Sequence, residues 1–122
     1  MTEHLHGNEV LKDLTPLGRQ LRNAIPDVYR GFARMHEAAY APGALDLKTK
    51  ELIALAISVV ERCDGCIAAH ARNVVRAGAT QDEAAEAIGV AIAMAGGPGT
   101  VYGPRAFDAV IEQLELRIAK ES

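Results

Sequence analysis

The apolar residues of this chain recur at intervals of three and four, and no segment alternates between apolar and polar residues as a strand does. Such spacing places apolar side chains on one face of an α-helix. Two sets show it most clearly: Val28, Phe32, Met35 and Ala39, and then Phe107, Val110, Ile111, Leu114 and Ile118. The sequence therefore predicts an all-α fold, a helical bundle of about six helices.

Prolines and turn residues mark the helices of the first third. Thr15-Pro16 has the form of a helix start, a hydroxyl cap followed by the imino acid that fits the first helical position. Residues 1 to about 13 are then expected to form a loose or docked lead-in. Pro26 interrupts this first helix and begins a second, which Pro42-Gly43 ends as a turn.

Asp46 is expected to cap a helix over residues 47–61. This segment is apolar around much of its circumference, so it should lie in the core. The next helix is predicted over residues 64–77 and ends at Gly78, a residue that readily adopts the left-handed conformation of a helix end.

Two further helices follow. Thr80 with Glu83 is a capping-box signature for a helix that reaches about residue 95. The glycine-rich stretch 96–99 ends it. The last helix begins either near Pro98 or at Pro104, and the sequence leaves both starts open.

Length and charge limit the classes of protein to consider. A chain of 122 residues without linker or repeat is one domain, residues 1–122. Its net charge of -3 gives no basic footprint for nucleic acid. The first seven residues lack the basic and apolar regions of a signal peptide, and the longest apolar runs are about half of a ~20-residue membrane span. We expect a cytoplasmic protein with no membrane partner.

The apolar runs 52–60 and 87–95 carry more apolar faces than one small core needs. The excess surface predicts contact with further copies of the chain, and therefore a homo-oligomer.

The chemistry is concentrated where the chain's two cysteines, Cys63 and Cys66, are followed by His70. On a helix these residues fall within a sector of about 60°, and residues three apart lie ~5 Å apart, inside the window for a disulfide. A helix N-terminus favours the thiolate, whereas the charge of Asp64 opposes it. Glu51 is a carboxylate on an otherwise apolar stripe, so it should be partly buried, with a histidine as a suitable partner.

Two other interpretations stay open at this point. Free cysteines are among the most buried residue types, so the pair could serve packing alone. Alternatively, Cys63, Cys66, His70 and Glu51 supply four candidate ligands for zinc, although the chain has no second CxxC or HxxxH. His4, His6 and His36 are expected at the surface. In a reducing cytosol an isolated cysteine pair favours catalysis or metal binding over a permanent staple.

The motifs resemble the carboxymuconolactone decarboxylase superfamily, and within it the alkylhydroperoxidase D-like branch, over roughly residues 30 to 112. The resemblance rests on these stretches: Leu45 to Ala56 with Glu51, Cys63-Asp64-Gly65-Cys66 with His70, Gly78-Ala79-Thr80 with Glu83, and Ala95-Gly96-Gly97-Pro98 with Tyr102. It implies an all-helical domain that assembles as a homotrimer or homohexamer. One difference is Gly65, where the best-studied members carry a histidine.

The resemblance also implies a function, thiol-dependent reduction of hydroperoxides without a bound cofactor. Cys66 would attack the peroxide, Cys63 would resolve the product to a disulfide, and Glu51 with His70 would relay protons. An external dithiol of the lipoyl or thioredoxin type would supply electrons. The alternatives are a decarboxylase acting on a small lactone, whose branch generally lacks the CxxC, and a non-catalytic redox sensor or zinc-binding oligomer.

Overall fold

The computed structural model describes residues 4–121, and within this range the chain forms six α-helices and no strand. In chain order these are α1 (Asn8–Ala24), α2 (Pro26–Tyr40), α3 (Leu47–Val60), α4 (Asp64–Arg76), α5 (Gln81–Ala95) and α6 (Gly97–Glu121). The predicted all-α class is confirmed. None of the helices in residues 4–121 has both the length and the apolarity that crossing a membrane requires.

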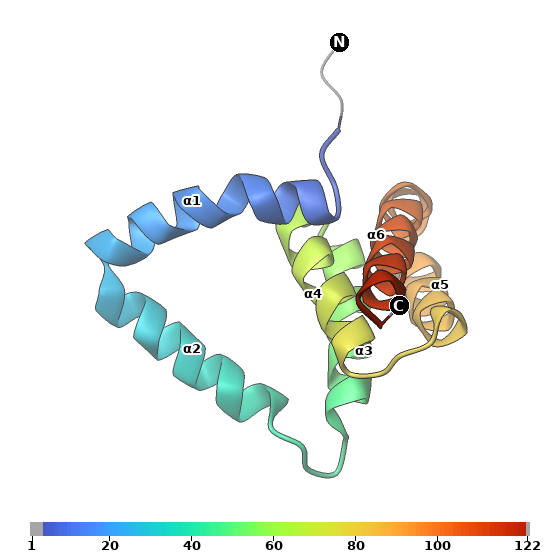
Figure 1. The fold of residues 1–122 in the computed structure, drawn as a ribbon. Helices are drawn as coiled ribbons and strands as arrows, with labels where there is room; N and C mark the ends of the chain where they lie inside the picture. Colours follow the sequence, from blue (N-terminus) through green and yellow to red (C-terminus); the bar gives the residue numbers. More distant parts are fainter. Residues whose placement is uncertain (1–3, 122) are drawn as a thin grey trace.

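Helices α3 to α6 pack into one bundle, whereas α1 and α2 extend away from it as two sides of an open angle (Figure 1). We refer to α1 and α2 together as the arm. The core lies within the bundle, and its largest fully buried side chains are Leu55, Val59, Ile67, Val74 and Val110. The arm is attached at both ends, by α1 against α4 and by α2 against α3.

The helix ends predicted from local capping residues in α3, α4 and α5 are confirmed. The Asp46 carboxylate accepts a hydrogen bond from the Thr49 backbone N–H at 2.8 Å, which fixes the start of α3. Thr80 and Glu83 form the reciprocal capping box at the start of α5. Gly78 has a φ of 90° and follows the end of α4, as its freedom from a Cβ predicts.

The predicted start of the first helix was wrong. Helix α1 begins at Asn8, and Pro16 lies inside it. The Asn8 backbone N–H donates to Glu112 Oε1 of α6 at 2.7 Å, so the acceptor for this helix end comes from a distant helix. Residues 8–13 are therefore helical rather than a lead-in, and residues 1–3 of that prediction lie outside the described range.

The start of α6 is at Gly97, so Pro104 lies within the helix. Two glycines let α6 approach α5 closely. A Cβ on Gly99 would lie 2.9 Å from the backbone Cα of Ile92, and one on Gly103 would lie 3.0 Å from Ile88 Cγ2. A real Cβ essentially never lies as close as 2.9 Å to another atom, and at 3.0 Å the Ile88 side chain would have to move. The absence of a side chain at both glycines therefore allows α6 to lie this close to α5.

Helix α3 is only partly in the core. Leu55 and Val59 are fully buried, but the opposite side of the helix is exposed. Large apolar side chains are exposed on that side and on α5: Ile53, Ile57, Val60, Val90 and Met94. The arm exposes a second set: Leu14, Leu17, Leu21, Ile25, Val28, Phe32 and Met35. The prediction of a core helix is thus confirmed for one face of α3.

Candidate active site

Cys63 and Cys66 lie at the start of α4 and are joined by a disulfide, with their Cα atoms 5.2 Å apart. Cys63 is the N-cap residue, and its sulfur accepts a hydrogen bond from the Cys66 backbone N–H at 3.2 Å. Arg62, with a φ of 56°, turns the chain sharply between α3 and α4. The predicted helix-start geometry and disulfide reach of the pair are confirmed.

The two sulfurs differ in their access to solvent. Cys66 is exposed, whereas Cys63 is half-buried. Cys66 faces an open pocket of about 230 Å³, the cysteine pocket, whose lining residues are Tyr40, Ala54, Ile57, Ser58, Glu61, Cys66 and His70. A small reagent arriving from solvent would therefore meet Cys66 first.

His70, which lines this pocket, forms a hydrogen-bonded pair with Glu51. Glu51 is only 4 % exposed, on the inner side of α3 beside the fully buried Leu55. His70 Nδ1 lies 2.7 Å from Glu51 Oε1 and bridges α4 to α3. The expected burial of Glu51 and its histidine partner are both confirmed. Because Nδ1 is engaged by Glu51, Nε2 is the ring nitrogen of His70 that can exchange a proton with a group in the pocket.

Sequence reasoning missed two aromatic rings beside His70. Tyr40 and His36 come from the last turns of α2, with their ring centroids 4.2 Å apart. The Tyr40 ring is stacked near His70 at 5.9 Å, and His36 lies 6.5 Å from it. Burial, reinforced by the nearby charge of Glu51, raises the pKa of Tyr40 above its ordinary value. Tyr40 therefore keeps its hydroxyl proton at neutral pH.

Lys50 holds this end of α2 in place. Its Nζ donates to the backbone carbonyls of Ala39 and Ala41, at 3.0 and 2.6 Å, on either side of Tyr40. A cation at a helix C-terminus satisfies carbonyls that have no partner within the helix. The i, i+4 spacing of His36 and Tyr40 predicts that the two rings share one face of a helix. Their position beside His70 depends on the return of α2 to α3, which the sequence does not show.

The N-terminal part of the chain covers the other side of the CxxC turn. His4 Nε2 lies 3.0 Å from Asp64 Oδ1, so the carboxylate expected to oppose the thiolate has a partner of its own. Leu14 of α1 packs over Gly65, where a Cβ would lie 3.0 Å from Leu14 Cδ1. A residue with a side chain at this position would press against α1.

The four residues considered as zinc ligands are divided into two bonded pairs, Cys63 with Cys66 and Glu51 with His70. In the part of the chain that the structure describes, no group of three or more His, Cys, Asp or Glu residues is placed to hold a metal ion. The arrangement brings the disulfide-bonded cysteine pair close to the hydrogen-bonded Glu51–His70 pair, since Cys66 and His70 line the same pocket.

Comparison with known proteins places these residues within a shared domain. The sequence profile of the carboxymuconolactone decarboxylase family matches residues 26–109. An uncharacterized protein of Cupriavidus necator is 38 % identical over 103 residues, which cover 80 % of this chain and 91 % of that protein.

Solved structures agree in fold. A carboxymuconolactone decarboxylase family protein from Legionella pneumophila, in its apo form, is 40 % identical with a TM-score of 0.83, covering 85 % of this chain and 93 % of its own. A family protein from Thermotoga maritima, described in connection with the antioxidative response, is 36 % identical with a TM-score of 0.69, covering 75 % and 94 %.

Proposed function

The chain belongs to the carboxymuconolactone decarboxylase family, and from this premise we propose that it is a thiol-dependent disulfide oxidoreductase that reduces hydroperoxides. One observation carries the proposal: an exposed cysteine, bonded to a second cysteine at a helix start, shares a pocket with a histidine that is held by a buried carboxylate. The Thermotoga maritima relative is described in connection with the antioxidative response, which is consistent with peroxide reduction.

The disulfide is the oxidised form of the site, so a cycle begins from the dithiol. The Cys66 thiolate attacks one oxygen of the peroxide, an S–O bond forms and the O–O bond breaks. The departing alkoxide takes a proton and leaves as an alcohol. Cys66 is then a sulfenic acid, oxidised by two electrons, and the peroxide has been reduced by two.

Resolution uses the second cysteine. The Cys63 thiolate attacks the Cys66 sulfur, an S–S bond forms, and the hydroxyl leaves as water after taking a proton. The short distance between the cysteine Cα atoms, 5.2 Å, supports this step without movement of the backbone. An external dithiol of the lipoyl or thioredoxin type then reduces the disulfide by thiol exchange and is itself oxidised to a disulfide.

The roles of the two cysteines follow from their access. Cys66 opens to the cysteine pocket and is assigned the attack on peroxide, whereas the half-buried Cys63 is assigned resolution. The helix N-terminus stabilises negative charge at both sulfurs. No metal or organic cofactor takes part in these steps.

His70 and Glu51 are proposed to carry the protons. His70 would take the Cys66 thiol proton through Nε2 and return it to the leaving oxygen. Glu51 fixes the ring through Nδ1 and stabilises the imidazolium while it exists. Because Glu51 is buried, its charge acts on His70 with little screening by water.

The test is peroxide consumption that depends on an added dithiol. Purified protein would be mixed with cumene hydroperoxide or hydrogen peroxide and with dihydrolipoamide or reduced thioredoxin. Wild-type protein should consume one dithiol for each peroxide. Cys66→Ser should abolish turnover, since a hydroxyl is a far poorer nucleophile than a thiolate.

Cys63→Ser is the matched control, because it keeps the attacking thiol. It should react once and accumulate a sulfenic acid that a dimedone-type reagent traps. Full turnover by Cys66→Ser would overturn the proposal. A wild-type disulfide that cycles with dithiols but never with peroxide would favour the redox sensor, and conversion of a lactone without any dithiol would favour the decarboxylase.

A further inference from the structure

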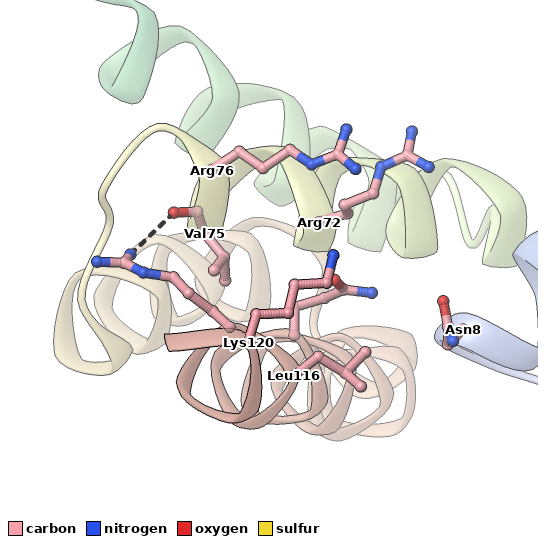
Figure 2. A pocket seen from close by; sticks show the side chains of 8 residues that line it. Asn8, Arg72, Val75, Arg76, Leu116 and Lys120 are labelled. Atoms are coloured by element: carbon pink, nitrogen blue, oxygen red, sulfur yellow. Dashed lines mark hydrogen bonds between the residues drawn. The ribbon is translucent and has the colours of Figure 1, made fainter. Parts of the chain in front are cut away.

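A second pocket lies between α4 and α6, where the start of α1 meets them (Figure 2). It has a volume of about 460 Å³, within the range of small-molecule sites. We call it the basic pocket, and its lining residues are Asn8, Arg72, Val75, Arg76, Gln113, Leu116, Arg117 and Lys120. None of them lines the cysteine pocket.

The lining of the basic pocket includes cations but no carboxylate residue. Figure 2 shows Arg72 and Arg76 extending from α4, with Lys120 pointing toward them from α6. Arg72 and Arg76 lie one helical turn apart, so their like charges repel each other. The chain as a whole is acidic, with a net charge of -3, which makes this concentration of positive charge a local feature.

Part of this charge has a structural explanation. Arg76 and Lys120 lie in the last turns of α4 and α6, where the helix dipole favours cations. Arg117 donates to the Val75 backbone carbonyl at 3.3 Å and lies 3.4 Å from Glu121. These three residues therefore need no ligand to account for their positions.

Arg72 has no such explanation. It lies before the last turn of α4, and its Nε is buried without a hydrogen-bond partner in the part of the chain that the structure describes. Burial and the charge of Arg76 lower its pKa, and the charge of Glu51 offsets only part of that effect. A buried guanidinium donor without an acceptor is costly, so an acceptor in the basic pocket would stabilise it.

We propose that the basic pocket binds a small anion carrying a phosphate group. Guanidinium groups donate paired hydrogen bonds to phosphate oxygens, and Arg72 and Arg76 together can surround one phosphate. Lys120 adds a charge from the opposite helix, and Asn8 and Gln113 add neutral polar groups. Val75 and Leu116 provide an apolar wall for the organic part of a phosphate ester.

Isothermal titration calorimetry with inorganic phosphate, pyrophosphate and citrate tests the proposal, in a buffer free of phosphate and sulfate. Pyrophosphate should bind saturably, with one site per chain, more tightly than inorganic phosphate. The double variant R72Q/K120Q should weaken pyrophosphate binding by at least about tenfold, because two charge-assisted contacts are lost. Binding should also weaken as sodium chloride is added.

The matched control is K12Q/R19Q, which removes the same charge from exposed positions of α1 outside the basic pocket. It should keep wild-type affinity, and circular dichroism should show that both variants are folded. An equal loss of pyrophosphate affinity in the two double variants would show that only net charge matters and would overturn the proposed site. Saturable binding of citrate without binding of either phosphate compound would overturn the assignment to phosphate, as would the absence of saturable heat with all three.

Discussion

At the scale of single residues, Glu51 is the most demanding feature of the chain. A carboxylate that is 4 % exposed beside fully buried Leu55 is stable only because it has a partner, and His70 supplies it at 2.7 Å. Replacing either member leaves a buried polar group with one partner fewer. The pair therefore combines a structural role with the proposed role in proton transfer, and a test has to separate the two.

Glu51→Gln and His70→Gln roughly preserve size and polarity, while the first removes the negative charge beside the imidazole and the second removes the group that exchanges the proton. Each should slow peroxide turnover by ~10² or more, the usual contribution of general acid–base help. The double variant should be little slower than the slower single variant, because both residues serve one relay. Steady-state rates would be compared after circular dichroism confirms folding. Additive losses would mean two separate roles, and unchanged rates would make the pair structural.

His6 gives the chain a predictable dependence on pH. Its Nε2 lies 2.7 Å from Asp108 Oδ2, and this hydrogen bond raises the pKa of His6 above its ordinary 6.5. The protonated form is favoured in the folded state, so this stabilisation is complete below pH 6.5 and is lost as pH rises through the higher folded pKa. NMR titration of the His6 ring should show the raised pKa. Asp108→Asn should return it toward 6.5, and an unchanged titration would contradict the assignment.

At the scale of elements, helices α3 and α5 have their capping groups nearby in sequence, and their starts were predicted correctly. Asp46 and the Thr80–Glu83 pair bond within three residues of themselves, so a local pattern was sufficient. Helix α1 obtains its acceptor from Glu112, more than a hundred residues away, and no local pattern can show that. The local pattern at Thr15-Pro16 therefore predicts a start that is too late in the chain.

The candidate site divides in the same way. The helical spacing of Cys63, Cys66 and His70 predicts that they lie on one face of a helix. The position of Glu51 on an apolar stripe predicts that its carboxylate is buried. Tyr40 and His36 depend on how α2 returns to α3, which Lys50 fixes through backbone carbonyls. Contacts between helices of this kind leave no periodic pattern in the sequence, so they could not be predicted from it.

The close contact of α5 and α6 predicts a difference between two glycines. Gly99→Ala should destabilise the bundle by about 1–3 kcal/mol, because its Cβ would meet the Ile92 backbone, which cannot move aside as a side chain can. Gly89→Ala is the control, since no atom lies within 4 Å of its Cβ. It should stabilise α5 by about 0.5–1 kcal/mol. Urea unfolding followed by circular dichroism measures both, and equal effects would show that the contact is loose.

At the scale of the whole molecule, many of the exposed apolar residues fall into two sets, one along the arm and one on α3 and α5. Phe32 is 59 % exposed and Met94 79 %, values that are unfavourable for a chain alone in water. We propose that the arm of one copy covers the α3–α5 face of another, in a homotrimer or homohexamer.

Light scattering during size exclusion should give a mass of three or six chains. Phe32→Asp should shift the protein to smaller species at micromolar concentration, because a charge would be buried at the contact. Arg34→Asp introduces the same residue at another exposed position of α2 and should leave the mass unchanged. A monomeric wild-type protein would defeat the proposal.

The arm also bears on how quickly different parts of the chain exchange their amide hydrogens. Helix α2 has no buried residue in the single chain, whereas α4 has five. Opening of α2 therefore breaks few contacts, and its amides should exchange with deuterium much faster than those of α4. If copies cover the arm, that exchange should slow as protein concentration rises while α4 stays constant. The exchange rates of α4 would then report the stability of the bundle within a single chain, and those of α2 would report the stability that assembly adds.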